Sequence, residues 1–135
     1  MATGKCAHAR ILYRCCVCKP ASYLSYRTYR RASRCVPGNG LSSTELLQCS
    51  LSMFKKHIES QFTDSMTWAN TKSWELDHIV PIKSVDAHGN KPSDEIQLKR
   101  FVWYNVRPVL ITEHRIKSAD ERKRGLYRVN LSTVA

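Results

Sequence analysis

The sequence predicts an α+β fold whose core lies in the second half of the chain. Residues 74–80 alternate large apolar and charged side chains before Pro81, which is the pattern of a strand that ends at a bend. Residues 102–111 are mostly apolar and predict a second strand. A helix is expected from Glu113 to about Arg124, with Thr112 as its cap and Gly125 as its stop.

The first half of the chain predicts helices. Arginines recur at helical spacing within residues 20–35, which indicates a helix with one basic stripe. A turn sequence at 36–40 predicts a linker at about 36–41. Ser42 and Glu45 have the spacing of a capping box that starts a short helix, and apolar residues from Leu51 to Phe62 recur at helical steps. This helical pair could enter a DNA groove as a helix-turn-helix, but packing on the core is favoured.

Charge is distributed unevenly along the chain. Lys and Arg number 22 against 11 Asp and Glu, and residues 1–40 contain eight of these bases and no acid. Such a local excess suits a polyanion, because Lys and Arg displace the counterions of a phosphate backbone; a solubilising arm is the alternative. We therefore expect DNA as the partner, bound in this region by four arginines: Arg27, Arg30, Arg31 and Arg34.

These patterns divide the chain into a basic arm at 1–40, a helical pair at 41–63, a core at 64–125 and a tail at 126–135. No run approaches the roughly 20 apolar residues of a membrane span, and the first residues lack an apolar signal core. The expected location is intracellular, without secretion or membrane attachment. The six cysteines are accordingly expected as thiols or zinc ligands rather than disulfides.

Four residues in the predicted core have a restrictive order. Asp77 and His78 end the first strand, Asn105 stands three residues before Pro108, and His114 follows nine residues after Asn105 in the last helix. With the surrounding segments MTWANTKSWELDHIVPIKS and NVRPVLITEHRIKSAD, this order resembles the HNH (His-Asn-His) endonucleases, most closely the phage and viral homing type. The likeness runs over about residues 44–120.

The resemblance implies a ββα-metal nuclease core and a role for each of these residues. Asp77 and His114 would hold one divalent cation, with Mg²⁺ or Mn²⁺ favoured and Ni²⁺ or Zn²⁺ also compatible with mixed oxygen and nitrogen ligands. His78 would act as general base, and Asn105 would tie the loop between the strands to the backbone and so orient that imidazole. Three further bases are candidate phosphate contacts, with a solvated surface role equally open: Arg107, Arg115 and Lys117.

A second metal site is conceivable among the cysteines. Cys15, Cys18 and Cys35 with Cys6, His8 or Cys49 could complete a tetrahedral zinc site, although the spacings are irregular. The favoured function is metal-dependent hydrolysis of DNA phosphodiesters by a monomer or homodimer. The alternative is a non-catalytic, zinc-stabilised nucleic-acid-binding protein.

Overall fold

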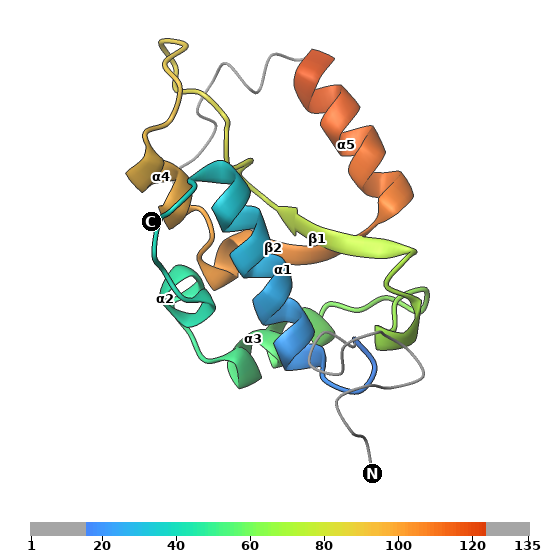
Figure 1. The fold of residues 1–135 in the computed structure, drawn as a ribbon. Helices are drawn as coiled ribbons and strands as arrows, with labels where there is room; N and C mark the ends of the chain where they lie inside the picture. The colour runs from blue at the N-terminus through green and yellow to red at the C-terminus, as the bar shows by residue number, and fades with distance from the viewer. Residues whose placement is uncertain (1–15, 124–135) are drawn as a thin grey trace.

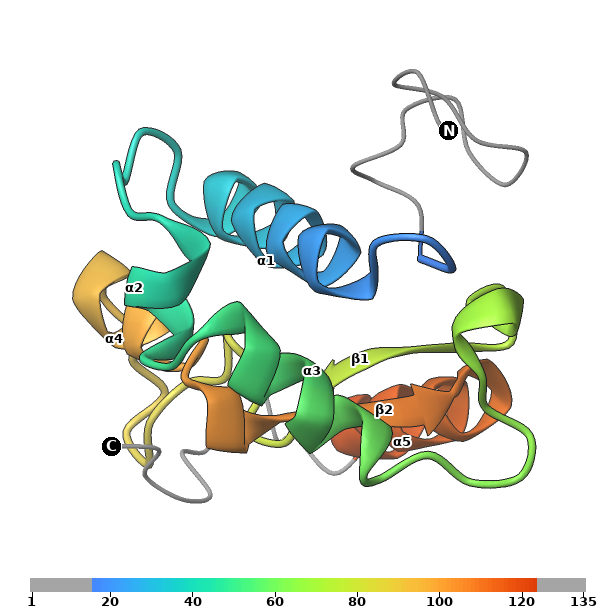
Figure 2. The same cartoon turned by 90° about the horizontal axis from the view of Figure 1, so that it is seen from below.

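The computed structural model describes residues 16–123 and is a mixed α+β fold built around a two-stranded antiparallel sheet. Strands β1 (Trp74–His78) and β2 (Val106–Leu110) pair so that Trp74 lies opposite Leu110 and His78 opposite Val106. In both views β1 lies between helices α1 (Pro20–Cys35) and α5 (Ile111–Lys123), as Figures 1 and 2 show. The sheet is therefore covered by segments from the two ends of the described chain.

Helix α1 is part of the core. Its buried face carries Leu24, Thr28 and Ala32, one turn apart. Leu24 packs in a cluster with Phe54, Trp74 and other apolar residues, while Ala32 belongs to a second cluster with Leu46, Ile82 and Phe101. The helix predicted over 20–35 is thus confirmed, but the expectation of an arm separate from the body is wrong for these residues, because its apolar face is needed to complete both clusters.

The helical pair forms as expected and packs on the core. Ser42 caps α2 (Ser43–Leu47) in a capping box with Glu45, and α3 (Leu51–Glu59) buries Phe54 and Ile58. Helix α3 contacts both α1 and β2. The packing role of this pair therefore accounts for its apolar face.

The second half differs from its predicted boundaries where β2 and α5 begin. Strand β2 starts at Val106 rather than 102, because residues Trp103–Asn105 form a 3₁₀ turn. A short helix, α4 (Asp94–Lys99), is capped by Ser93. Helix α5 begins at Ile111, whose N–H donates to the Ser73 carbonyl, so Thr112 lies inside the helix instead of capping it.

No helix within residues 16–123 has the length and apolar character needed to cross a bilayer.

Candidate active site

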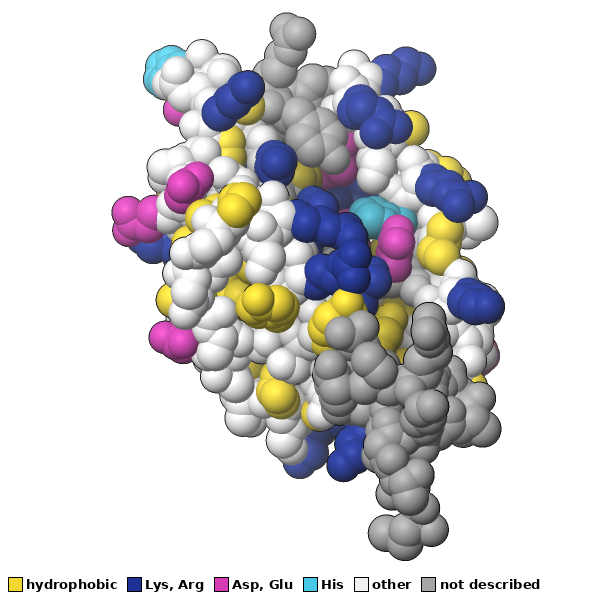
Figure 3. Space-filling model, in the orientation of Figure 1, with side chains coloured by type: hydrophobic (Ala, Val, Ile, Leu, Met, Phe, Trp, Pro, Cys, Tyr) yellow, Lys and Arg dark blue, Asp and Glu magenta, His cyan; other side chains and the backbone are white. Residues whose placement is uncertain are grey.

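Residues from α1, β1 and α5 line one cleft of about 360 Å³. Figure 3 shows Lys and Arg side chains gathered in the middle of this face, over α1, beside a histidine and an acidic side chain. The cleft brings together Asp77, His78 and His114 with arginines that lie more than 40 positions away in the sequence. Because α1 packs on the core, its arginines lie beside the cleft residues of β1 and α5.

Asp77 is the buried anion at the floor of the cleft, with 1% of its surface exposed. Its Oδ2 accepts a hydrogen bond from Arg107 Nε at 3.1 Å, and its Oδ1 accepts one from Lys117 Nζ at 3.0 Å. Arg107 stands opposite Asp77 in the β1–β2 register, and Lys117 comes from α5. A carboxylate this deeply buried requires such charged partners, since isolated burial of an ion is very costly.

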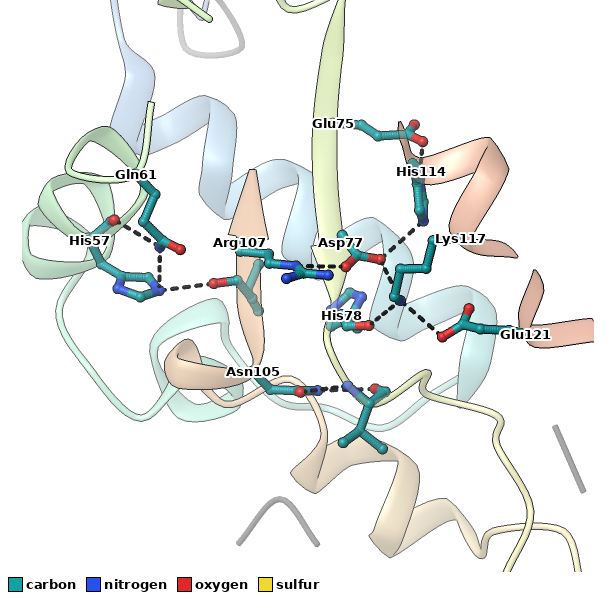
Figure 4. A network of polar contacts seen from close by, with 12 residues as sticks. His57, Gln61, Glu75, Asp77, His78, Asn105, Arg107, His114, Lys117 and Glu121 are labelled. Atoms are coloured by element: carbon teal, nitrogen blue, oxygen red, sulfur yellow. Dashed lines mark hydrogen bonds and ion pairs between the residues drawn. The ribbon is translucent and has the colours of Figure 1, made fainter. Parts of the chain in front are cut away.

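His114 reaches the same carboxylate from the first turns of α5. Its Nε2 lies 3.2 Å from Asp77 Oδ1, and its Nδ1 makes a short hydrogen bond to Glu75 Oε1 (Figure 4). A protonated ring would donate to both carboxylates, whereas a neutral ring that donates its Nδ1 proton to Glu75 would present the Nε2 lone pair to Asp77. Nitrogen and oxygen lone pairs then face each other across a short gap, an arrangement that a cation between them would stabilise.

The separation of these two atoms is suitable for one shared ion. Two ligands at about 2.1 Å from a metal lie about 3.0 Å apart in octahedral and about 3.4 Å apart in tetrahedral coordination. The observed 3.2 Å between His114 Nε2 and Asp77 Oδ1 falls between these values. The pair therefore fits a divalent cation, although no set of three or more His, Cys, Asp or Glu side chains arranged to hold a metal is found within residues 16–123.

His78 lies next to this pair at the end of β1, half-buried and lining the cleft. Its ring packs edge-on against Phe101, and among the described residues neither ring nitrogen has a hydrogen-bond partner. Burial lowers the pKa of His78 to about 4, and the positive charge of Arg31 acts in the same direction. The imidazole is consequently neutral at pH 7, and it is a weaker base than an unperturbed histidine.

Asn105 connects the loop that follows β1 to the turn that precedes β2. Its Oδ1 accepts from the Val80 N–H at 2.8 Å, and its Nδ2 donates to the carbonyls of Val80 and Arg100 at 3.1 and 2.8 Å (Figure 4). The Asn105 carbonyl also accepts from the Ile79 N–H. These contacts fix the backbone immediately after His78. The resemblance to HNH endonucleases implies a tie of this kind for Asn105.

Arg100 holds the next part of the same loop. Its guanidinium donates to three carbonyls, those of Pro81, Ile82 and Ser84, at 2.9 to 3.2 Å. Burial lowers the pKa of Arg100, but an arginine stays charged at neutral pH. Among the described residues, the hydrogen bonds of the Arg100 guanidinium therefore go to neutral carbonyl groups rather than to a carboxylate.

The bases proposed to contact phosphate fall into three groups. All four arginines of α1 line the cleft. Arg107 and Lys117 are ion-paired with Asp77, and Lys117 also contacts Glu121 at 3.1 Å. Arg115 is exposed and is not among the residues that line the cleft.

Two site residues were not singled out from the sequence. Glu75 precedes Asp77 by two positions, so strand alternation places both carboxylates on one face of β1. This alternation along the strand is the sequence signal from which Glu75 could have been predicted as a site residue. Glu121 stands one turn after Lys117 on α5, and it is buried. The i, i+4 spacing predicts the pair, but its burial depends on the packing of α5 against the sheet.

A zinc site that combines Cys18 and Cys35, conceivable from the sequence, is not compatible with the fold. Cys18 precedes α1 and Cys35 is its last residue, and a 16-residue helix is about 24 Å long. Ligands of one zinc ion lie only a few ångströms apart. Cys18 and Cys35 cannot share an ion, while Cys6 and Cys15 lie outside the described residues.

Comparison with known proteins gives two similar viral sequences. "Uncharacterized protein L426" of Acanthamoeba polyphaga mimivirus is 36% identical over 77 residues, which is 56% of this chain and 32% of that protein. "Uncharacterized protein L246" of the same virus is 36% identical over 73 residues, or 53% of this chain and 30% of that protein. The chain thus spans about a third of the length of these relatives. No family model and no solved structure matches the chain.

Proposed function

We propose that this protein is a metal-dependent DNA endonuclease of the HNH type, with a ββα-metal core formed by β1, β2 and α5. The observation that carries the proposal is the buried Asp77 carboxylate facing His114 Nε2 at 3.2 Å, with neutral His78 beside it. Glu75, which contacts His114 Nδ1, supports the proposal because metal-binding imidazoles are commonly oriented by a carboxylate. The homing role among viral or phage endonucleases is part of this proposal.

Asp77 Oδ1 and His114 Nε2 would hold the ion, which supplies stabilisation of charge on the phosphate and the leaving oxygen. An imidazole nitrogen of His78 takes a proton from water while the water oxygen bonds to phosphorus. The bond from phosphorus to the 3′ oxygen breaks, this oxygen takes a proton from solvent, and the His78 imidazolium releases its proton to solvent. The products are a 5′-phosphate and a 3′-hydroxyl.

Asn105 and Arg100 contribute by holding the loop that follows His78. Their hydrogen bonds keep the imidazole at the cleft floor without contacting substrate. A base acts only when it is aligned with the attacking water, so loss of this support lowers the rate through orientation.

The alternative is a protein that binds nucleic acid without cleaving it. Both carboxylate oxygens of Asp77 already accept hydrogen bonds from cations, Arg107 and Lys117, and this observation favours a structural role for Asp77. Such a protein would use the same basic cleft. Cleavage and metal binding separate the two functions.

The decisive experiment incubates the full-length protein with supercoiled plasmid and Mg²⁺ or Mn²⁺, with a chelator as control. We expect nicked or linear products only with metal, and a rate about 10²–10⁴-fold lower for His78→Gln. His88→Gln, in the exposed 86–90 loop, is the matched control and should cut normally. His114→Ala should weaken metal binding in a calorimetric titration and regain part of its activity at high metal concentration. Intact plasmid with every metal would favour the binding protein.

A further inference from the structure

The cleft has two kinds of positive charge. Lys117 on α5 is used inside the protein, where it contacts Asp77, Glu121 and the His78 carbonyl. Three exposed arginines on α1 are different: within residues 16–123, Arg27, Arg31 and Arg34 have neither an acidic partner nor a hydrogen bond. Most of the charge that remains available to an anion is therefore on α1, and Lys83, in the loop after β1, is a further exposed base that lines the cleft.

These arginines form a row of suitable length for a nucleic-acid strand. Arg27 and Arg34 are seven residues apart, which is about 10 Å along a helix. One strand of duplex DNA carries a phosphate about every 3.4 Å along its axis, so about three phosphates lie within this length. Arg31 is the middle member of the row, and Figure 3 shows Lys and Arg side chains gathered beside a histidine on this face.

We infer that α1 binds the backbone of the DNA strand that is cut, with Arg31 contacting the reacting phosphate opposite Asp77 and His114. Arg27 and Arg34 bind the phosphates on either side and set the position of the strand. The contact of Arg31 with the reacting phosphate rests on the proposed function, whereas the binding of a strand along α1 does not. Helix α1 is thus one wall of the active site rather than a separate DNA-binding arm.

Binding is tested first without metal. The anisotropy of a short fluorescent duplex is measured in EDTA at several salt concentrations for wild type, Arg27→Gln, Arg31→Gln and Arg34→Gln. Each variant should bind several-fold more weakly and reduce the slope of log K against log salt by about one. Lys56→Gln is the matched control, because Lys56 is exposed on α3 outside the cleft. Slopes of the arginine variants equal to that of Lys56→Gln would overturn strand binding along α1.

The position of Arg31 is tested next by single-turnover cleavage of duplexes that carry one uncharged methylphosphonate. Arg31→Gln should lower the rate at saturating DNA, while Arg27→Gln and Arg34→Gln should mainly raise the DNA concentration needed for half-maximal rate. Arg31→Lys should recover only part of the rate, because an ammonium lacks the forked donor geometry of a guanidinium.

A methylphosphonate next to the cut should slow wild type more than the variant that has lost the arginine facing it. Cleavage by Arg31→Gln at the wild-type rate would refute its contact with the reacting phosphate. Changed salt slopes in a protein that cuts no DNA would instead support strand binding along α1 and contradict the proposed nuclease.

Discussion

The two walls of the cleft carry the same kind of charge in opposite situations. On α5, Lys117 and His114 are bound to the carboxylates of Asp77, Glu121 and Glu75. On α1, within the described chain, Arg27, Arg31 and Arg34 are exposed and have no acidic partner. Within the described chain, the α5 side chains thus have carboxylate partners, whereas the exposed α1 arginines have none.

This difference assigns different energetic roles to the walls. Removing a cation from α5 leaves buried carboxylates without a partner and should lower stability. Removing one from α1 relieves repulsion among exposed arginines and should affect only ligand binding. Variants of the two walls, and of the loop and the histidine that lie between them, test this difference.

The largest expected effect on stability is that of Asn105→Ala. Three buried hydrogen bonds disappear, and the backbone groups of Val80 and Arg100 lose their partner. We expect the free energy of unfolding to fall by about 3–5 kcal/mol, as measured by urea denaturation. Asn90→Ala, which loses one side-chain hydrogen bond to Asp86 in an exposed loop, should cost less than about 1 kcal/mol. Equal urea midpoints for the two variants would show that the hydrogen bonds of Asn105 to the loop after β1 do not hold the fold together.

His78, which lies between the walls, should give the next largest effect through pH. Arg31, Lys117 and His114 add to burial in lowering its pKa to about 4, and Asp77 opposes them. Between pH 6.5 and 4 the unfolded chain binds more protons at this residue, so its contribution to stability is lost as pH falls through that window. The loss is at most about 3 kcal/mol. Urea midpoints at pH 7.5 and 5, with a chelator present, should differ less in His78→Gln; an unchanged difference would argue against a buried neutral imidazole.

Lys117→Gln should lower stability by about 2 kcal/mol. The variant keeps much of the side-chain volume but removes the counterion of Asp77 and Glu121, both at least 94% buried. Lys55→Gln breaks an i, i+4 pair of similar geometry on a more exposed surface and should cost about 0.5 kcal/mol or less. Arg31→Gln should change stability by less than about 0.5 kcal/mol in the same denaturation assay. If Arg31→Gln were destabilised like Lys117→Gln, the two walls would not differ in what their cations contribute to stability.

The smallest effect is expected for Arg115→Gln. Arg115 is exposed on α5 and does not line the cleft. Its removal should change DNA affinity by less than about twofold and leave the salt slope close to that of Lys56→Gln. A slope reduced by about one would place DNA across the outer surface of α5 as well.

Local patterns predicted the elements more reliably than their boundaries. Periodicity and capping signals located α1, α2, α3 and both strands, since these depend on neighbouring residues. Apolar residues before β2 suggested a longer strand, but the side chain of Asn105 bonds to distant backbone groups and holds a turn there. The contact spans 25 positions of sequence, so no local pattern reports it.

The candidate site was predictable in its principal residues but not in its charge pairing. Asp77, His78, Asn105 and His114 lie near one another at the ends of the elements that the sequence predicts. In the sequence, Lys117 and Arg31 look like equivalent exposed bases. Only the packing of α1 and α5 shows that one has buried acidic partners and the other has none among the described residues.

The contacts of Arg100 have a practical consequence for purification. The loop behind the cleft is held by a guanidinium on three neutral carbonyls and by apolar packing, which salt hardly weakens. The proposed binding along α1 depends on exposed charge and should be strongly screened. A wash at high ionic strength should therefore strip co-purifying nucleic acid and leave the protein folded, so that preparations free of host DNA can be made without denaturation.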